Sequence, residues 1–337
     1  MGQIVSRDAA GSCNRMLKTR AGCLPENVRS LGRKRIQTVR IELDWELDDC
    51  DRLVTDARSQ SIWEDYIIQG NLQSVHGSNS LVRQCRRQRG NSSGEYVVKT
   101  IIKSKFDDVR LEREIRYLRL LDHPNIVHLV DVYEDEHCVH IVTPLSKGGN
   151  LAERATRRME SGEGFDEREI AFIAFQLLSA LAHCHSMNIA HRDIKLENIT
   201  FDSDEKFATL QLIDFGFGKE LGELDSITSN RHSVVGSLFY LAPDTVSGVY
   251  STKVDIWGVG IVVHILMCGK PVFDGYTEEE VLGKIRNYSV LSTTGSQWKH
   301  MSFTARRFLG SLLCKDENLR PTAQEALGHP WLQQFAF

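Results

Sequence analysis

The sequence predicts an α+β protein with two unlike lobes, a small β-rich lobe over residues 66–144 and a larger helical lobe over residues 145–331. Strand-like runs dominate the first region and helical patterns the second, which is the order typical of segregated α+β folds. The chain has 337 residues, which is long for a single hydrophobic core. Its 41% hydrophobic and 26% charged residues are ordinary for a globular protein.

The predicted small lobe combines five strands with one helix. Apolar runs rich in β-branched residues favour strands at 66–68, 80–85, 96–102, 126–133 and 138–142. The polar stretch 86–94 is expected to form the turn between the second and third of these strands. The charged segment 107–121 repeats its apolar residues every three or four positions, which indicates an amphipathic helix. Pro124 follows closely and is expected to stop that helix.

The predicted large lobe is built mainly from helices. Their apolar periodicity places them at 169–185, 254–267, 305–314 and 322–327. The longest apolar stretch, 256–268, has 13 residues. A bilayer span needs about 20 residues, so this stretch predicts a buried core helix.

Charge and cysteine content narrow the functional classes. A net charge of −4 argues against nucleic acid as a partner. The eight cysteines have neither metal-ligand spacing nor a disulfide pattern. They predict a reducing, cytoplasmic environment in which most of the thiols pack as small hydrophobic groups. The N-terminus lacks the apolar segment of a secretory signal.

Residues 1–60 read as an N-terminal extension that is disordered, first basic and then acidic. Nine Lys/Arg against two acids give residues 1–40 a net charge of +7, while residues 41–60 carry a net charge of −5. Gly2 with Ser6 fits the N-myristoylation pattern. One acyl chain binds membranes weakly, so the basic block would supply a second signal, with Cys13 and Cys23 as palmitoylation candidates. We therefore expect peripheral attachment to a membrane surface; a solvated arm, or one folding onto the acidic block, is the alternative.

The chemistry-bearing residues gather in two short segments. Asp193, Lys195 and Asn198 lie at offsets of two and five, and Asp214 follows the strand-like run 210–213. Phosphoryl transfer needs a carboxylate to orient the attacking hydroxyl, a cation on the moving phosphate and oxygen ligands for magnesium. These two segments supply all three, with Asn198 and Asp214 as the hard oxygen ligands.

Two further charged residues belong to the small lobe. Lys99 ends the run 96–99 within the expected strand 96–102, and Glu114 lies 15 residues later in the predicted helix. Alone, each would be read as a solvated surface charge. The tract 118–127 that follows Glu114 gives this pair a different meaning, because it matches a known family pattern.

Together these segments resemble the catalytic domain of eukaryotic protein kinases, most closely the calcium/calmodulin-dependent and calcium-dependent group. The resemblance implies a bilobal kinase-like fold, ATP and Mg²⁺ as cofactors, and Ser/Thr hydroxyls of a protein substrate as acceptors. It assigns Asp193 as catalytic base, Lys195 to the transferring phosphate, and Lys99 to the α- and β-phosphates with Glu114 holding it. Because the chain ends soon after Trp331, no EF-hand or calmodulin-binding segment is expected after the catalytic domain.

The same resemblance outlines the nucleotide slot. It assigns Val75, Gly77 and Ser80 to the three positions of the glycine-rich loop, Val82 and Val97 to the roof, Thr143 to the back of the adenine pocket, Leu145 to the hinge and Thr200 to the floor. Two of the three loop glycines are replaced, which hinders close approach of the backbone to phosphates. Weakened nucleotide binding, and with it a pseudokinase scaffold, is therefore the alternative to an active enzyme.

The segment after Asp214 carries the remaining expectations. Arg192 is expected to pair with a phosphate on this segment, for which Thr228, Ser229 and Ser233 are candidates; ordinary polar loop residues are the alternative. The stretch 236–244 resembles the peptide platform of protein kinases, which disfavours a small-molecule kinase.

Three motifs near the catalytic segments invite other interpretations. His191 is expected to pack in the core and not to act as a base. His183 and His185 are two residues apart on a predicted helix, so they do not share a face for a metal. The acidic stretch 202–205 is expected to be a hairpin turn and not a calcium loop.

Overall fold

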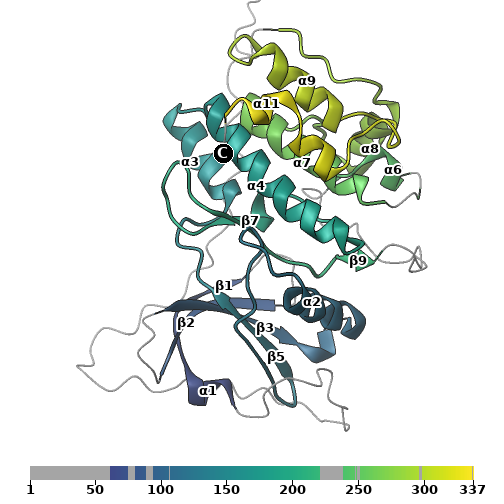
Figure 1. Ribbon diagram of the computed structural model, residues 1–337. Helices are drawn as coiled ribbons and strands as arrows, with labels where there is room; N and C mark the ends of the chain where they lie inside the picture. Colours follow the sequence, from purple (N-terminus) through teal and green to yellow (C-terminus); the bar gives the residue numbers. More distant parts are fainter. Residues whose placement is uncertain are drawn as a thin grey trace, which may run out of the picture. The chain divides into compact units, whose positions relative to one another are not determined.

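The computed structural model describes residues 61–74, 80–88, 94–105, 107–220, 238–246, 248, 251–295, 298–335 and 337. Its first elements are α1 (Ile62–Asp65), β1 (Tyr66–Ser74), β2 (Ser80–Arg87), β3 (Glu95–Ile102), η1 (Lys103–Lys105), α2 (Asp108–Leu120), β4 (Asp131–Glu134) and β5 (Cys138–Pro144). The strands form a five-stranded antiparallel sheet in the order β1-β2-β3-β5-β4, with α2 beside it (Figure 1). This region is the expected β-rich lobe.

Helix α2 begins and ends where its sequence dictates. The side chain of Asp107 accepts a hydrogen bond from the N–H of Val109 at 3.1 Å and caps the first turn. Leu121 leaves the helical conformation before His123 and Pro124. The apolar face, with Leu111 and Ile115, is buried. The charged residues between them are thereby left to face the neighbouring segments and the solvent.

The helical lobe contains α3 (Leu151–Ser161), α4 (Glu167–Ser186), α6 (Pro243–Val246), α7 (Lys253–Cys268), α8 (Glu278–Asn287), α9 (Phe303–Leu312), α10 (Ala323–Leu327) and α11 (Pro330–Gln333). Two small antiparallel sheets lie among them, β6 (Ile189–Ala190) with β9 (Lys219–Glu220), and β7 (Ile199–Phe201) with β8 (Leu210–Leu212). The short η2 (Leu196–Asn198) joins β6 to β7. These short sheets hold the segments that carry the predicted catalytic residues.

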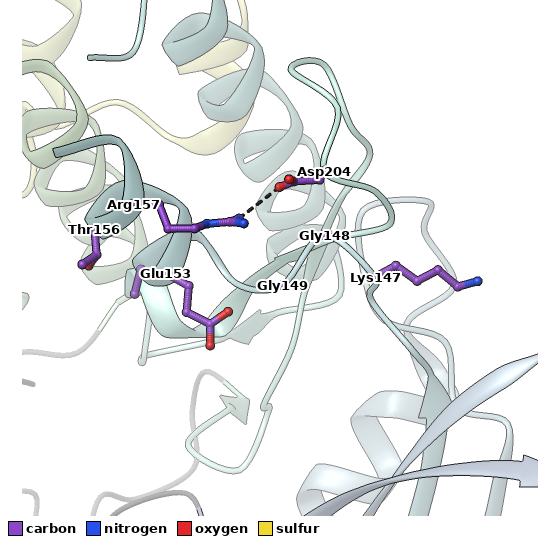
Figure 2. A pocket seen from close by; sticks show the side chains of 8 residues that line it. Lys147, Gly148, Gly149, Glu153, Thr156, Arg157 and Asp204 are labelled. Carbon is purple, nitrogen blue, oxygen red and sulfur yellow. Dashed lines mark hydrogen bonds and ion pairs between the residues drawn. The ribbon is translucent and has the colours of Figure 1, made fainter. Parts of the chain in front are cut away.

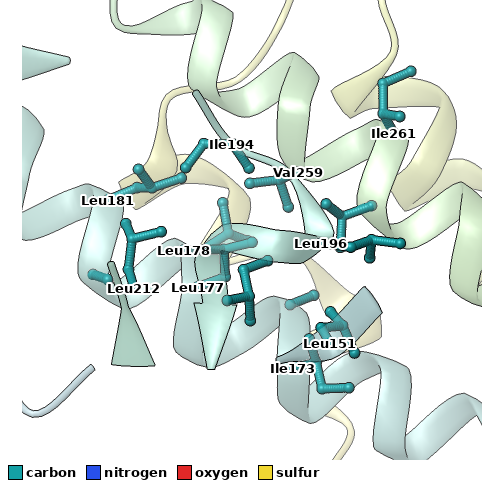
Figure 3. Packing of buried hydrophobic residues seen from close by; sticks show 14 of the residues in the cluster. Leu151, Ile173, Leu177, Leu178, Leu181, Ile194, Leu196, Leu212, Val259 and Ile261 are labelled. Carbon is teal, nitrogen blue, oxygen red and sulfur yellow. The ribbon is translucent and has the colours of Figure 1, made fainter. Parts of the chain in front are cut away.

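Helix α7 is the centre of the large hydrophobic core. It is buried from Asp255 to Met267, and a helix that is apolar on all sides needs neighbours on all sides. Figure 3 shows Leu178 and Leu181 of α4 close to Ile194 and Val259. Ile194 belongs to the segment of Asp193, so the core extends directly beneath the predicted catalytic loop. Among the described residues, no helix has the length and apolar character needed to cross a membrane.

Most expected elements are confirmed, and one strand is wrong. Residues 126–130 do not form a strand, and β4 starts only at Asp131. The N–H of Val127 instead donates to the carbonyl of Leu212 at 3.0 Å, so these residues make a local bridge to β8. The helices α1, α3, α6, α8 and α11 were not predicted. α1, α6 and α11 have only four residues each, and α3 and α8 bury few of their residues.

Candidate active site

The loop that carries Asp193 is fixed from below by a buried carboxylate of α7. Asp255 accepts the backbone N–H groups of His191 at 2.9 Å and Arg192 at 2.7 Å. The Nε2 of His185 lies 2.8 Å from the same carboxylate. Burial would raise the pKa of Asp255, but the hydrogen bond from His185 holds it below its ordinary value. Asp255 therefore stays an acceptor for the loop.

Asp193, Lys195 and Asn198 come together as the sequence predicts. The Nζ of Lys195 lies 2.7 Å from Oδ2 of Asp193. The Nδ2 of Asn198 donates to the same oxygen at 2.9 Å and to the carbonyl of Asp193 at 2.8 Å. Both of these hydrogen bonds use the amide nitrogen of Asn198, so its Oδ1 is available as a ligand for a cation. The carboxylate of Asp193 is thereby oriented by two donors, as a group that must position a hydroxyl requires.

His191 is a core residue, as expected. Its ring is fully buried and packs edge-on against Phe215, with ring centres 4.8 Å apart. Its Nε2 lies 3.1 Å from the carbonyl of Ile213, and its Nδ1 lies 3.3 Å from the N–H of Asp193. This network implies the tautomer protonated at Nε2. His191 thus links the loop of Asp193 to the segment that leads into Asp214 and takes no part as a base.

The second group joins β3, α2 and the segment after β8. The Nζ of Lys99 lies 2.6 Å from Oε1 of Glu114 and 3.5 Å from Oδ1 of Asp214. Glu114 is buried, whereas about a third of the Asp214 side chain (34%) is exposed. The expected pair of Lys99 and Glu114 is therefore present in the geometry, and it faces a partly open carboxylate.

The charges in this group reinforce one another. Burial works against the charge on Lys99, but the carboxylates of Asp214 and Glu114 outweigh it and raise the pKa of Lys99. Burial would also raise the pKa of Asp214, yet Lys99 and the N–H of Gly216 hold it at about 2. Desolvation raises the pKa of Glu114 in spite of its cationic partner. A fixed ammonium beside an anionic carboxylate suits a phosphate group and a magnesium ion respectively.

Two of the residues around this centre have a strained backbone. Arg192 has φ of 67° and Asp214 has φ of 65°, the left-handed region that only glycine adopts freely. Such conformations cost energy and persist only where neighbouring contacts enforce them. At Asp214 the strain aims the carboxylate toward Lys99. Both outliers therefore coincide with the predicted chemistry.

The nucleotide-slot residues that the structure describes in the small lobe lie on three neighbouring strands, β2, β3 and β5, and in the hinge. Val82 and Ile141 flank Lys99 in the sheet, and Val97 stands opposite Thr143. Leu145 donates its N–H to the carbonyl of Glu95 at 3.0 Å. Ser80 is buried at the start of β2. Val75 and Gly77 lie outside the described residues, as do Gly2, Cys13, Cys23, Thr228, Ser229 and Ser233.

Thr200, which the resemblance assigns to the floor of the nucleotide slot, has its hydroxyl paired. The hydroxyl donates to the carbonyl of Gln211 at 3.1 Å and accepts from the hydroxyl of Ser146 at 2.9 Å. Ser146 belongs to the hinge, so this bond ties the hinge to β7. A paired hydroxyl avoids the desolvation cost of a free one. The tie could not be predicted, because Ser146 and Thr200 are 54 residues apart.

A surface hollow of 650 Å³ opens beside the N-terminal half of α3, away from these residues (Figure 2). Its lining includes Gly148, Gly149 and Glu153, and the ion pair of Arg157 with Asp204 at 3.0 Å closes one side. Asn150, just before the helix, accepts the N–H of Glu153 and caps it. Asp204 lies between β7 and β8, which confirms the expected hairpin turn at 202–205. None of the predicted catalytic residues lines the hollow.

Sequence reasoning missed several supporting residues. Asp255 and His185 act on the loop of Asp193 from distant helices, and Arg110 contacts the segment after Asp214. For Arg110 a signal existed, because it lies one helical turn before Glu114 and shares its face. For the pair of Asp255 and His185, 70 residues apart, only the fold could reveal the contact.

Comparisons with known proteins point to one family. A model of the protein kinase domain matches residues 75–332. Calcium-dependent protein kinase 5 of Plasmodium berghei (strain Anka) is 32% identical over 257 residues, which cover 76% of this chain and 44% of that protein. CDPK-related kinase 5 of Arabidopsis thaliana is 37% identical over 254 residues, which cover 73% of this chain and 41% of that protein. Calcium-dependent protein kinase 27 of Oryza sativa subsp. japonica is 35% identical over 248 residues, with 72% and 39% covered.

The chain thus spans about two fifths of the length of these curated relatives. The calcium dependence in their names describes those proteins. The resemblance predicted from the sequence, to this kinase group, is confirmed.

Proposed function

Because the chain belongs to the protein kinase family, we propose that it transfers the γ-phosphate of ATP to Ser/Thr hydroxyls of protein substrates, with magnesium as cofactor. One observation carries the proposal. Lys99 contacts Glu114 and Asp214, and Asp193 contacts Lys195 and Asn198, so the kinds of group that phosphoryl transfer needs occur in two clusters. The Ser/Thr preference rests on Lys195, two residues after Asp193, as in Ser/Thr kinases.

The donor set fits magnesium. Asp214 offers an anionic carboxylate and Asn198 an amide oxygen, and Mg²⁺ is usually held by one or two such ligands together with substrate phosphates. When bound, the ion neutralises charge that develops on the phosphates. Lys99 would bind phosphate oxygens, Asp193 would orient the acceptor hydroxyl and take its proton, and Lys195 would offset charge on the transferring group.

A transfer assay tests the proposal. Wild-type protein should move radiolabelled phosphate from ATP to casein or histone, and Asp214→Ala should reduce this by about 10²-fold or more, as loss of an electrostatic stabiliser does. Phosphoamino-acid analysis should show phosphoserine or phosphothreonine. Absence of transfer by the wild type at millimolar ATP would refute the activity.

The pseudokinase alternative draws support from the loop positions Val75, Gly77 and Ser80. Thermal shift with Mg²⁺ and ATP separates the two functions, again with Asp214→Ala as control. Binding without turnover would favour the scaffold. A small-molecule kinase would bind ATP with Mg²⁺ but would phosphorylate neither casein nor histone.

We further propose that residues 66–331 form the catalytic domain and that residues 1–60 form an extension that directs it to a membrane surface in the cytoplasm. Support comes from the sequence alone, namely Gly2 in a myristoylation pattern and the +7 charge of residues 1–40. Gly2→Ala should move the protein from the membrane fraction to the soluble fraction. An unchanged distribution would dispose of the anchor.

Phosphorylation of Thr228, Ser229 or Ser233 is also proposed to regulate the kinase activity, with Arg192 pairing with the phosphate. Peptide mass spectrometry of the recombinant protein, beside Asp193→Ala, would detect such autophosphorylation. Equal occupancy in the two proteins would assign it to another kinase.

A further inference from the structure

One face of α2 packs along the segment that follows Asp214. Arg110, Glu114 and Tyr117 lie at spacings of four and three, so they point the same way from consecutive turns. Each reaches a different part of the segment 214–220. Glu114 binds Lys99 beside Asp214, while Arg110 and Tyr117 contact residues further along. The proposed phosphoryl transfer gives a role to Glu114 only. The contacts of Arg110 and Tyr117 therefore need a separate explanation.

Arg110 makes two contacts with this segment at once. Its Nε donates to the carbonyl of Gly216 at 2.8 Å. Its guanidinium carbon lies 3.5 Å from the centre of the Phe217 ring, a close cation–π geometry. The side chain is partly buried. A planar guanidinium can stack on a ring and donate in its own plane at the same time, which a lysine ammonium cannot do.

Gly216 stands where the side chains of three residues converge. A Cβ at this position would lie 3.2 Å from Oδ1 of Asp214, 3.3 Å from Nε of Arg110 and 3.3 Å from Oε2 of Glu114. The segment therefore approaches α2 as closely as its backbone allows. Gly218 shows the same fit, since a Cβ there would meet the ring of Tyr117 at 3.0 Å.

This close packing bears directly on the conformation of Asp214. The φ of 65° at Asp214 is a strained conformation, and surrounding contacts must offset its cost in free energy. Its own carboxylate accepts the N–H of Gly216 at 3.3 Å, which is a weak local bond. The contacts of Arg110 fix Gly216 and Phe217, the second and third residues after Asp214, and leave the backbone at Asp214 little freedom to relax.

We propose that Arg110 is a positioning residue that clamps the segment 214–220 against α2 and so holds Asp214 in its strained, metal-facing conformation. The proposal deepens the kinase function and rests on it for the role of Asp214. Arg110 itself need not touch nucleotide or metal; it acts through Gly216 and Phe217.

A neighbouring arginine supplies the matched control. Arg116, on the same helix, pairs with Glu220 at 2.7 Å, but its side chain is 61% exposed. Exposed pairs of this kind contribute little. Arg110→Met and Arg116→Met remove the same charge from the same helix, and only the first removes the clamp.

Hydrogen exchange of the ligand-free protein tests the clamp without any reference to activity. Arg110→Met should speed exchange in peptides covering residues 214–220 by about 10-fold, since it deletes one hydrogen bond and one cation–π contact. Exchange in α7 should not change, and Arg116→Met should match the wild type. Equal exchange of residues 214–220 in Arg110→Met and wild type would overturn the proposal.

The Mg²⁺ concentration that half-saturates casein phosphorylation gives a second readout. The direction of its change in Arg110→Met distinguishes loss of charge from loss of positioning. Removing a positive charge near Asp214 would by itself favour the metal and lower its half-saturating concentration. Loss of positioning predicts the opposite, a rise of about 10-fold in Arg110→Met. A fall or no change would refute the positioning role.

A double variant tests whether Arg110 acts through Phe217. Phe217→Leu should reproduce part of the exchange defect, and Arg110→Met combined with Phe217→Leu should be no worse than Arg110→Met alone. Fully additive defects would show that Arg110 acts elsewhere. If the wild type neither binds nor uses ATP, the kinase function fails, whereas the exchange experiment still decides on the clamp.

Discussion

The loop of Asp193 and the residues around Lys99 serve one predicted reaction, but they are held in place by different means. The loop rests on a buried carboxylate, because Asp255 accepts two of its backbone N–H groups and is itself bound by His185. Lys99 depends on a single ion pair to one residue of α2 and on Asp214, which is partly exposed. The first arrangement is anchored in the core, and the second depends on an ion pair and a partly exposed carboxylate.

This difference suggests which side can change conformation. Buried backbone hydrogen bonds break only when the core opens, so the loop should behave as part of the core. An ion pair between a strand and a helix can separate when the helix shifts. We therefore expect perturbations of the loop to lower global stability, and perturbations around Lys99 to act mainly on nucleotide binding.

The largest effect on stability is expected from Asp255→Asn. The amide cannot accept all three donors, and each buried donor without a partner costs about 1–3 kcal/mol, so the free energy of unfolding should fall by about 3 kcal/mol. Urea unfolding followed by circular dichroism measures this.

The same substitution should have a marked pH dependence. The folded-state pKa of Asp255 lies below its ordinary value, so its contribution is complete above the unfolded pKa, about 4, and is lost as the pH falls further. The gap between wild type and Asp255→Asn should therefore narrow in acid. A gap that is constant with pH would contradict the charged anchor.

A smaller loss of stability is expected from Lys99→Met. Removing one partner of a fully buried ion pair costs about 3–5 kcal/mol, and the partial exposure of Lys99 should reduce this to about 2 kcal/mol. ATP-dependent thermal shift should disappear. The cost arises because Glu114 is left buried and its pKa is already raised by desolvation.

The double variant Lys99→Met with Glu114→Gln tests whether the unpaired charge of Glu114 causes the loss of stability. It should be more stable than Lys99→Met alone, because no uncompensated charge is left. ATP binding should stay lost. If the double variant is the less stable of the two, the penalty comes from lost packing and not from the charge.

The smallest change concerns the back of the nucleotide slot and should leave stability nearly unaltered. Thr143 on β5 stands opposite Val97 and is only partly buried. A small residue here admits bulky pyrazolopyrimidine inhibitors, and Thr143→Met should weaken them by more than about 10-fold through a steric clash. Competition with ATP measures the affinity. Unchanged inhibition would show that Thr143 does not face the slot.

The sequence was most informative where chemistry requires fixed residues at fixed spacings. Asp193, Lys195 and Asn198 lie within one span of six residues, so the contacts among their side chains could be expected from the sequence. The strand of Lys99 and the helix of Glu114 also follow from periodicity. Sequence reasoning failed at residues 126–130, where an apolar run that resembles a strand bonds to β8 instead of joining the sheet.

By itself, then, the sequence determined the two-lobed α+β fold, the family resemblance and the identity of the reacting groups, because these depend on local patterns. Only the tertiary structure decided what supports them. The contacts of Asp255 with His191, of Thr200 with Ser146 and of Arg110 with Gly216 join residues 54 to 106 positions apart. No local pattern encodes such pairs, because they exist only after the core has brought distant segments within hydrogen-bonding distance.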